Sequence, residues 1–75
     1  MKLTVDQEAD ALHFRLVDVP VAESDDIAPG IIVDYDESIQ IIGFEVLCLS
    51  KRQPPMNPMD FQFQITPKMP DQTEQ

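Results

Sequence analysis

The sequence is short of several features that other classes of protein require. It has one cysteine among 75 residues, so no internal disulfide can form. No apolar run approaches the roughly 20 residues that cross a bilayer. The N-terminal residues also lack the succession of basic, apolar and small residues that marks a secretory signal. Together these absences predict a cytoplasmic protein without a membrane span.

Basic residues are also scarce, with five Lys and Arg against 14 Asp and Glu and a formal net charge of -9. Nucleic acids and anionic membranes are bound by Lys and Arg that meet phosphate, so neither is expected as a partner. A field of this sign would steer a basic protein instead. The alternative is that the charge only keeps a small protein soluble.

The length allows one domain, near the lower limit at which a hydrophobic core supports a fold without disulfides or metal. A chain of this size gains stability by burying its apolar surface against another copy. The sequence therefore predicts a homo-oligomer, with a dimer favoured.

Alternating apolar and polar residues predict strands in the first half of the chain. Met1–Val5 and Ala11–Val17 both alternate, and a polar loop that can hold a helical turn joins them as a hairpin. Val21–Ile27 is weaker because of its two aspartates, and predicts a short edge strand at most. Within Ala11–Val17, His13 is expected on the polar side of the strand, away from the core.

A second hairpin is predicted after Pro29 and Gly30, which suit a type II turn. Its strands are Ile31–Tyr35 and Ile41–Leu49, both rich in β-branched and aromatic residues. The second strand is partly apolar on both faces, so it is either central or covered by another chain. Gly43 within it indicates a bulge or a close backbone approach.

The composition changes after Lys51, where five of the seven prolines lie. Within this proline-rich part, residues 60–66 (DFQFQIT) alternate and predict one further strand, which pairs either in its own subunit or with another. The expected architecture is mainly β: a single antiparallel sheet of about five or six strands, a meander of hairpins with at most one short helical turn. Residues 1–52 form this core and 53–75 a C-terminal extension.

The runs VDQEADALHFRL, VAESDDIAPGIIVDYD and IIGFEVLCLSKR follow one another in this order. They resemble the bacterial domain-of-unknown-function family 2283 between Leu3 and Arg52. The residues that carry the resemblance are Glu8, Ala9, Asp10, Ala11, Leu12, Pro29, Gly30, Asp34, Tyr35, Asp36, Gly43, Glu45, Ser50 and Lys51. The resemblance brings no established activity, but it implies an antitoxin-like setting beside small basic toxin-like proteins.

Two segments depart from the family pattern. Cys48 and Leu49 stand where the family usually has Asp and a small residue, and Glu37–Ile39 replace its usual Asp-Gly turn. A tight glycine-dependent turn is therefore not expected here.

Candidate catalytic and metal sites are incomplete. Asp6, Glu8 and Asp10 have the spacing of the first calcium-loop ligands, but Ala11 and Val17 stand where the loop needs Gly and Glu. Asp10 is expected to cap the turn instead. Cys48 is expected to be buried and on a different face from His13, so it lacks the base that would activate it.

Three functions remain open from the sequence. The first is a non-enzymatic interaction module, self-associating through the second face of Ile41–Leu49 and binding a basic protein; the second is a purely structural homo-oligomer. The third is a carboxylate-based metal or small-ligand enzyme using Asp34, Asp36 and Glu45. The first is favoured, with no catalytic, cofactor or metal residue assigned. The interaction candidates are Asp34, Asp36, Glu45, Leu47, Leu49, Phe61 and Phe63.

Overall fold

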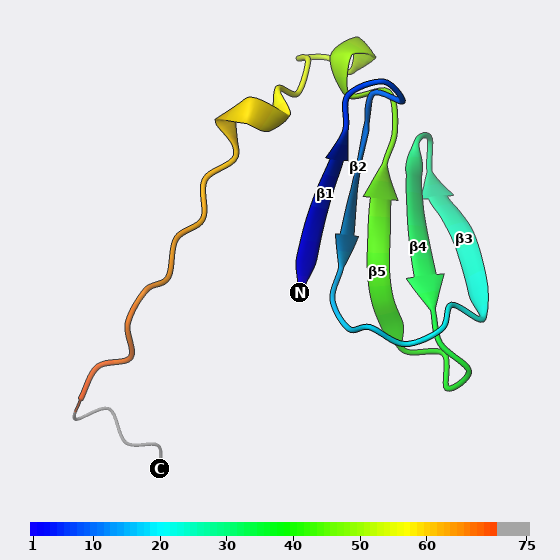
Figure 1. The fold of residues 1–75 in the computed structure, drawn as a ribbon, viewed down its shortest axis with the longest axis vertical. Helices are drawn as coiled ribbons and strands as arrows, with labels where there is room; N and C mark the ends of the chain where they lie inside the picture. Colours follow the sequence, from blue (N-terminus) through cyan, green and yellow to red (C-terminus); the bar gives the residue numbers. More distant parts are fainter. Residues whose placement is uncertain (71–75) are drawn as a thin grey trace.

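The computed structural model describes residues 1–70, which form one five-stranded antiparallel sheet and a C-terminal extension (Figure 1). The strands are β1 (Lys2–Asp6), β2 (Ala11–Arg15), β3 (Glu23–Ala28), β4 (Ile31–Tyr35) and β5 (Ile41–Val46). Two three-residue 3-10 helices follow, η1 (Leu49–Lys51) and η2 (Pro58–Asp60). The prediction of a mainly β chain with a single antiparallel sheet is confirmed. Both helical turns come after the sheet rather than in the first hairpin loop.

The strands lie in the order β1-β2-β5-β4-β3, so the last strand of the chain is the central one. Of the two alternatives for this strand, a central position or cover by another chain, the strand order shows the central position. The order also departs from a simple meander, because residues 16–22 cross from β2 to the far edge at β3. Figure 1 shows this connection running along one end of the sheet, past β5 and β4.

The two turns around β4 use different residues to reverse the chain. Gly30 has a φ of 74°, as the predicted Pro-Gly turn requires. The loop between β4 and β5 places Ile39 at a φ of 62° and is held by Asp36, whose Oδ1 accepts hydrogen bonds from the Ser38 and Gln40 amides. A side chain therefore replaces the glycine-dependent turn that is typical of the family.

One face of the sheet, which we call the apolar face, carries two rows of apolar side chains across four strands. The rows, read from the strand register, are Leu3–Phe14–Phe44–Val33 and Val5–Leu12–Val46–Ile31. The Phe14 and Phe44 rings lie 5.5 Å apart at their centroids. Of these eight residues only Val33 and Val46 are buried, and no second layer of strand or helix within residues 1–70 packs on this face.

The last strand of the sheet is shorter than predicted. The strand predicted over Ile41–Leu49 ends at Val46, because Cys48 adopts a left-handed φ of 56°. Cys48 is consequently exposed, not buried as expected.

The strand predicted over residues 60–66 is absent: η2 ends at Asp60 and residues 61–69 belong to no helix or strand. Figure 1 shows this segment leading away from the sheet. Residues 60–66 do alternate, but a strand also needs a neighbouring strand for its hydrogen bonds, and within residues 1–70 of the same chain none lies beside them.

Candidate functional site

The face opposite the apolar face carries most of the polar side chains of the sheet, and we call it the polar face. One row across it reads Lys2–Arg15–Gly43–Asp34–Ser24, and the next reads Thr4–His13–Glu45–Ile32–Asp26. The prediction that His13 lies on the polar side of its strand is confirmed. Non-sequential strand order brings these residues together, since β2 and β4 both flank β5.

Gly43 allows the backbones of β5 and β2 to approach closely at the centre of the polar face. A Cβ atom at this position would lie 2.8 Å from the Phe14 carbonyl oxygen and 3.6 Å from Asp34 Oδ2. The β4–β5 register also shifts beside Gly43, between Asp34 and Tyr35. Both expectations for Gly43, a close backbone approach and a bulge, are therefore confirmed.

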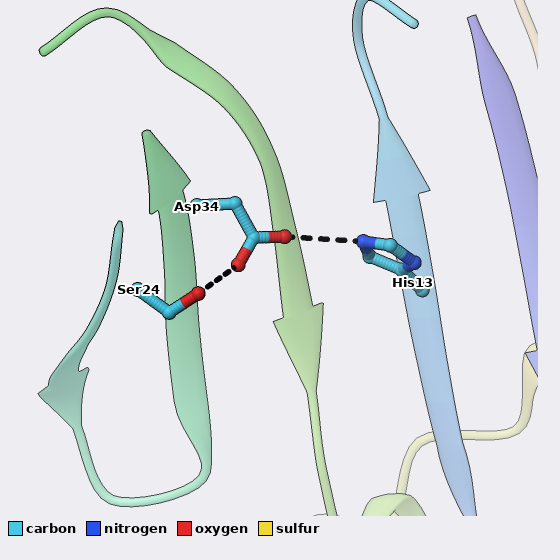
Figure 2. Close-up of polar contacts among 3 residues, drawn as sticks. All are labelled: His13, Ser24 and Asp34. Atoms are coloured by element: carbon cyan, nitrogen blue, oxygen red, sulfur yellow. Dashed lines mark hydrogen bonds and ion pairs between the residues drawn. The ribbon is translucent and has the colours of Figure 1, made fainter. Parts of the chain in front are cut away.

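The Asp34 side chain reaches across β5 to His13 on β2, as Figure 2 shows. Asp34 Oδ2 lies 3.3 Å from His13 Nε2 on β2, and Asp34 Oδ1 accepts a 2.7 Å hydrogen bond from the Ser24 hydroxyl on β3. We call these three residues the Asp34 cluster. The Asp34 side chain is 10% exposed and that of His13 36%, so a nearly buried carboxylate is satisfied by one neighbour on each side.

The order of the three side chains determines what chemistry they can support. In a nucleophilic triad the imidazole stands between the hydroxyl and the carboxylate, so that it can take the hydroxyl proton. Here the carboxylate stands in the middle, and Ser24 donates to Asp34 rather than to His13. The cluster therefore acts as a cross-strand clamp that joins β2, β4 and β3.

Two further carboxylates named from the sequence lie outside this cluster. The Asp36 carboxylate accepts hydrogen bonds from two amides of the β4–β5 loop. Glu45 is half-buried on the polar face, in register with His13 and Ile32. Asp34, Asp36 and Glu45 are thus not assembled into one site. Among residues 1–70, no group of three or more His, Cys, Asp or Glu side chains is placed to hold a metal ion.

The apolar interaction candidates separate into two kinds. Leu49 is 2% exposed and belongs to the core, so it offers no surface to a partner. Leu47 is half-buried, and its amide donates to the Gly30 carbonyl. Phe61 and Phe63 are 55% and 77% exposed on the extension.

Asp10 forms hydrogen bonds with a residue far away in the sequence, which was not expected. Its carboxylate accepts hydrogen bonds from the Ser50 amide at 3.1 Å and from the Ser50 hydroxyl at 2.7 Å, across 40 residues of sequence. The turn after β1 is instead capped by Asp6, which accepts from the Ala9 amide. The expectation that Asp10 caps its own turn is therefore wrong, since Asp10 caps η1.

Residues 2–50 match the model of one protein family, described as protein of unknown function (DUF2283). The chain belongs to this family. The searches of curated proteins and of solved structures gave no significant match to this chain. Several residues that carry the DUF2283 resemblance meet in the fold: Asp10 binds Ser50, and Asp34 lies against Gly43. These parts of the pattern hold the sheet and its ends together.

Sequence reasoning did not identify the Asp34 cluster. It treated His13 as a surface residue and did not single out Ser24. The available signal was the pair formed by Gly43 and Asp34, a residue without a side chain in a central strand and a carboxylate within its neighbour.

In residues 1–70, neither 3-10 helix has the length or the apolar character to cross a membrane.

Proposed function

We propose that this chain is a non-enzymatic, cytoplasmic protein-interaction module that pairs with a second copy of itself through the apolar face. The observation that carries the proposal is a single sheet whose apolar rows have no second layer of strand or helix above them within residues 1–70. Sheets are stable in water when the apolar face packs on another element.

The size of the core supports this pairing. The buried apolar residues within residues 1–70 are Ala11, Val33, Ile42, Val46 and Leu49. The larger side chains beside them, Phe14 and Phe44, remain only half-buried. Two such sheets stacked face to face at about 10 Å would bury both rows of each copy and complete a two-layer core.

The surface proposed for self-association differs from the surface that the sequence predicts. Leu47 and Leu49 were the expected contacts, on the second face of the last strand, but that strand ends at Val46 and Leu49 is buried. The apolar face, with Leu3, Phe14 and Phe44, takes their place.

Sedimentation equilibrium of the full chain tests the pairing. The expected mass is twice the 8.5 kDa of one chain. Leu3→Lys places a charge on the apolar face and should give a monomer, with the sheet verified by circular dichroism. Thr4→Lys adds the same charge on the opposite side of the same strand and should leave the dimer intact. A monomeric wild-type protein, or equal behaviour of the two variants, would contradict the proposal.

A basic protein is proposed as the second partner because of the charge on the β3 edge. Glu23, Asp25 and Asp26 are all exposed on this edge strand. Face-to-face pairing would leave Asp26 free, since it lies on the polar face, whereas Asp25 is opposite Val33 on the apolar face. The family resemblance implies small basic proteins encoded beside such chains. The affinity for such a protein should fall steeply with salt and fall further in Asp26→Asn. Asp60→Asn, outside the sheet, is the control, and an affinity independent of salt would refute this part.

A further inference from the structure

Two cations face each other at one end of the polar face. Lys2 on β1 and Arg15 on β2 are directly opposite in the strand register. Like charges in this arrangement repel and destabilise a strand pair. No acidic side chain within residues 1–70 lies within 4.0 Å of either cation, since the single ion pair there joins His13 to Asp34. This is unexpected in a chain with 14 acidic residues.

Arg15 also carries an unsatisfied donor. Its Nε atom is buried and has no hydrogen-bond partner in the part of the chain that the structure describes. Gly43, the residue opposite Arg15 on β5, has no side chain that could accept. A buried donor without an acceptor loses the hydrogen bonds that it makes to water in the unfolded chain, so such atoms usually have a ligand, an ion or a water as partner.

A surface depression of about 340 Å³ lies at these residues. It is lined by Met1, Lys2, Thr4, His13, Arg15, Val17 and Asp18. Ammonium, guanidinium and hydroxyl groups are the donors that recognise phosphate and carboxylate oxygens. Asp18 contributes the one carboxylate, which would favour a ligand that also carries a hydroxyl or another donor.

The Asp34 cluster supports one wall of this depression. Asp34 contacts Nε2 of His13, Figure 2 shows the imidazole between Asp34 and its own strand β2, and the same residue lines the depression. The ring is thus fixed between the clamp on one side and the depression on the other. This link gives the clamp a second role, which is to orient a lining residue.

We propose that this depression, which we call the basic depression, binds an oxyanion of a small molecule, a phosphate or carboxylate group, held chiefly by Arg15 and Lys2. The anion would offset the repulsion between the two cations and accept hydrogen bonds from the Arg15 guanidinium, which lines the depression. The site is independent of the pairing through the apolar face, since it lies on the opposite side of the sheet.

Titration of the ¹⁵N-labelled full chain, followed by amide chemical shifts, tests the proposal. Sodium phosphate and sodium acetate are titrated separately at constant ionic strength, so that the two arms distinguish a phosphate from a carboxylate ligand. Saturable shifts confined to residues 2–4 and 13–18 are expected. Lys2→Gln and Arg15→Gln should each weaken the binding at least tenfold, whereas Lys51→Gln removes the same charge elsewhere and should not.

Shifts that grow linearly with either anion in the wild-type chain would overturn the proposal, because they indicate no site. An equal loss of affinity in Lys51→Gln and Lys2→Gln would also overturn it, since it would show that only net charge matters. Lys2 is exposed on an edge strand, so its substitution keeps the test valid even where Arg15→Gln fails to fold.

Discussion

Asp34 and Gly43 are partners in the β4–β5 register, and the Asp34 carboxylate lies only 3.6 Å from where a Cβ atom of residue 43 would stand. Gly43 has no side chain to stand between Asp34 on β4 and His13 on β2. Because β5 separates the two strands, this contact adds a side-chain connection across the central strand to the backbone ladder.

Gly43→Ala should destabilise the protein by about 1–3 kcal/mol, the usual cost of forcing extra atoms into a packed site. The new Cβ would lie 2.8 Å from the Phe14 carbonyl oxygen, so the backbone of β2 would have to move. Urea denaturation measures the loss. Gln40→Ala, an exposed position just before β5, should remain close to wild type. A Gly43→Ala protein within about 0.5 kcal/mol of wild type would refute this account, since that is the range of neutral surface substitutions.

The hydrogen bond between Asp34 and His13 should appear as a coupling in a double-mutant cycle. Asp34→Ala alone is expected to cost about 1–3 kcal/mol because it leaves His13 and Ser24 without their acceptor. Combining it with His13→Ala should cost less than the sum of the two, by about 0.5–1.5 kcal/mol. Thr4→Ala, which touches none of the cluster's bonds, should be additive with Asp34→Ala. Additivity of His13→Ala with Asp34→Ala would show that the contact contributes nothing.

Asp10→Ala should lower the free energy of unfolding by about 1–2 kcal/mol, as loss of a helix cap does. The carboxylate holds the Ser50 amide and hydroxyl, and Asp10 itself has a left-handed φ of 58° that alanine tolerates poorly. Asp10→Asn keeps an acceptor and tolerates that conformation, so it should lose less. Hydrogen exchange at the Ser50 amide should accelerate in Asp10→Ala, and unchanged protection would argue against the cap.

Ile39→Asn should stabilise the protein by about 1 kcal/mol, because a β-branched residue in the left-handed region is strained and asparagine is not. Ile39 has a φ of 62° and is 76% exposed, so little packing is lost. Thermal denaturation provides the measurement. Ile65→Asn makes the same chemical change at a 72% exposed position outside the sheet and should have no such effect. A lower melting temperature for Ile39→Asn would contradict the strain argument.

The sequence predicts well the features that depend on neighbouring residues. Alternation predicts the first hairpin, and β-branched and aromatic residues predict the second. Pro29 and Gly30 predict the turn between β3 and β4. The two apolar faces of the strand predicted over Ile41–Leu49 indicate either a central position, which it has, or cover by another chain. Each of these follows from the local pattern of side chains.

Features that depend on distant pairing were beyond the sequence. The contact of His13 with Asp34 requires the order β2-β5-β4, which no local pattern encodes. The left-handed conformation of Cys48 could not be inferred from its residue type, so the end of β5 was misplaced. Residues 60–66 alternate correctly but have no strand beside them, and alternation alone does not provide one.

The β3 edge also limits how the sheet can grow. Continuous fibres built by edge-to-edge addition need two usable edges, one to add and one to receive. Carboxylates at Glu23, Asp25 and Asp26 and the register shift between Asp26 and Ala28 oppose addition at β3. Addition at the β1 edge is therefore not matched by an equally receptive β3 edge, which opposes continuous growth. In a chain with so small a core, this asymmetry disfavours amyloid-like polymerisation.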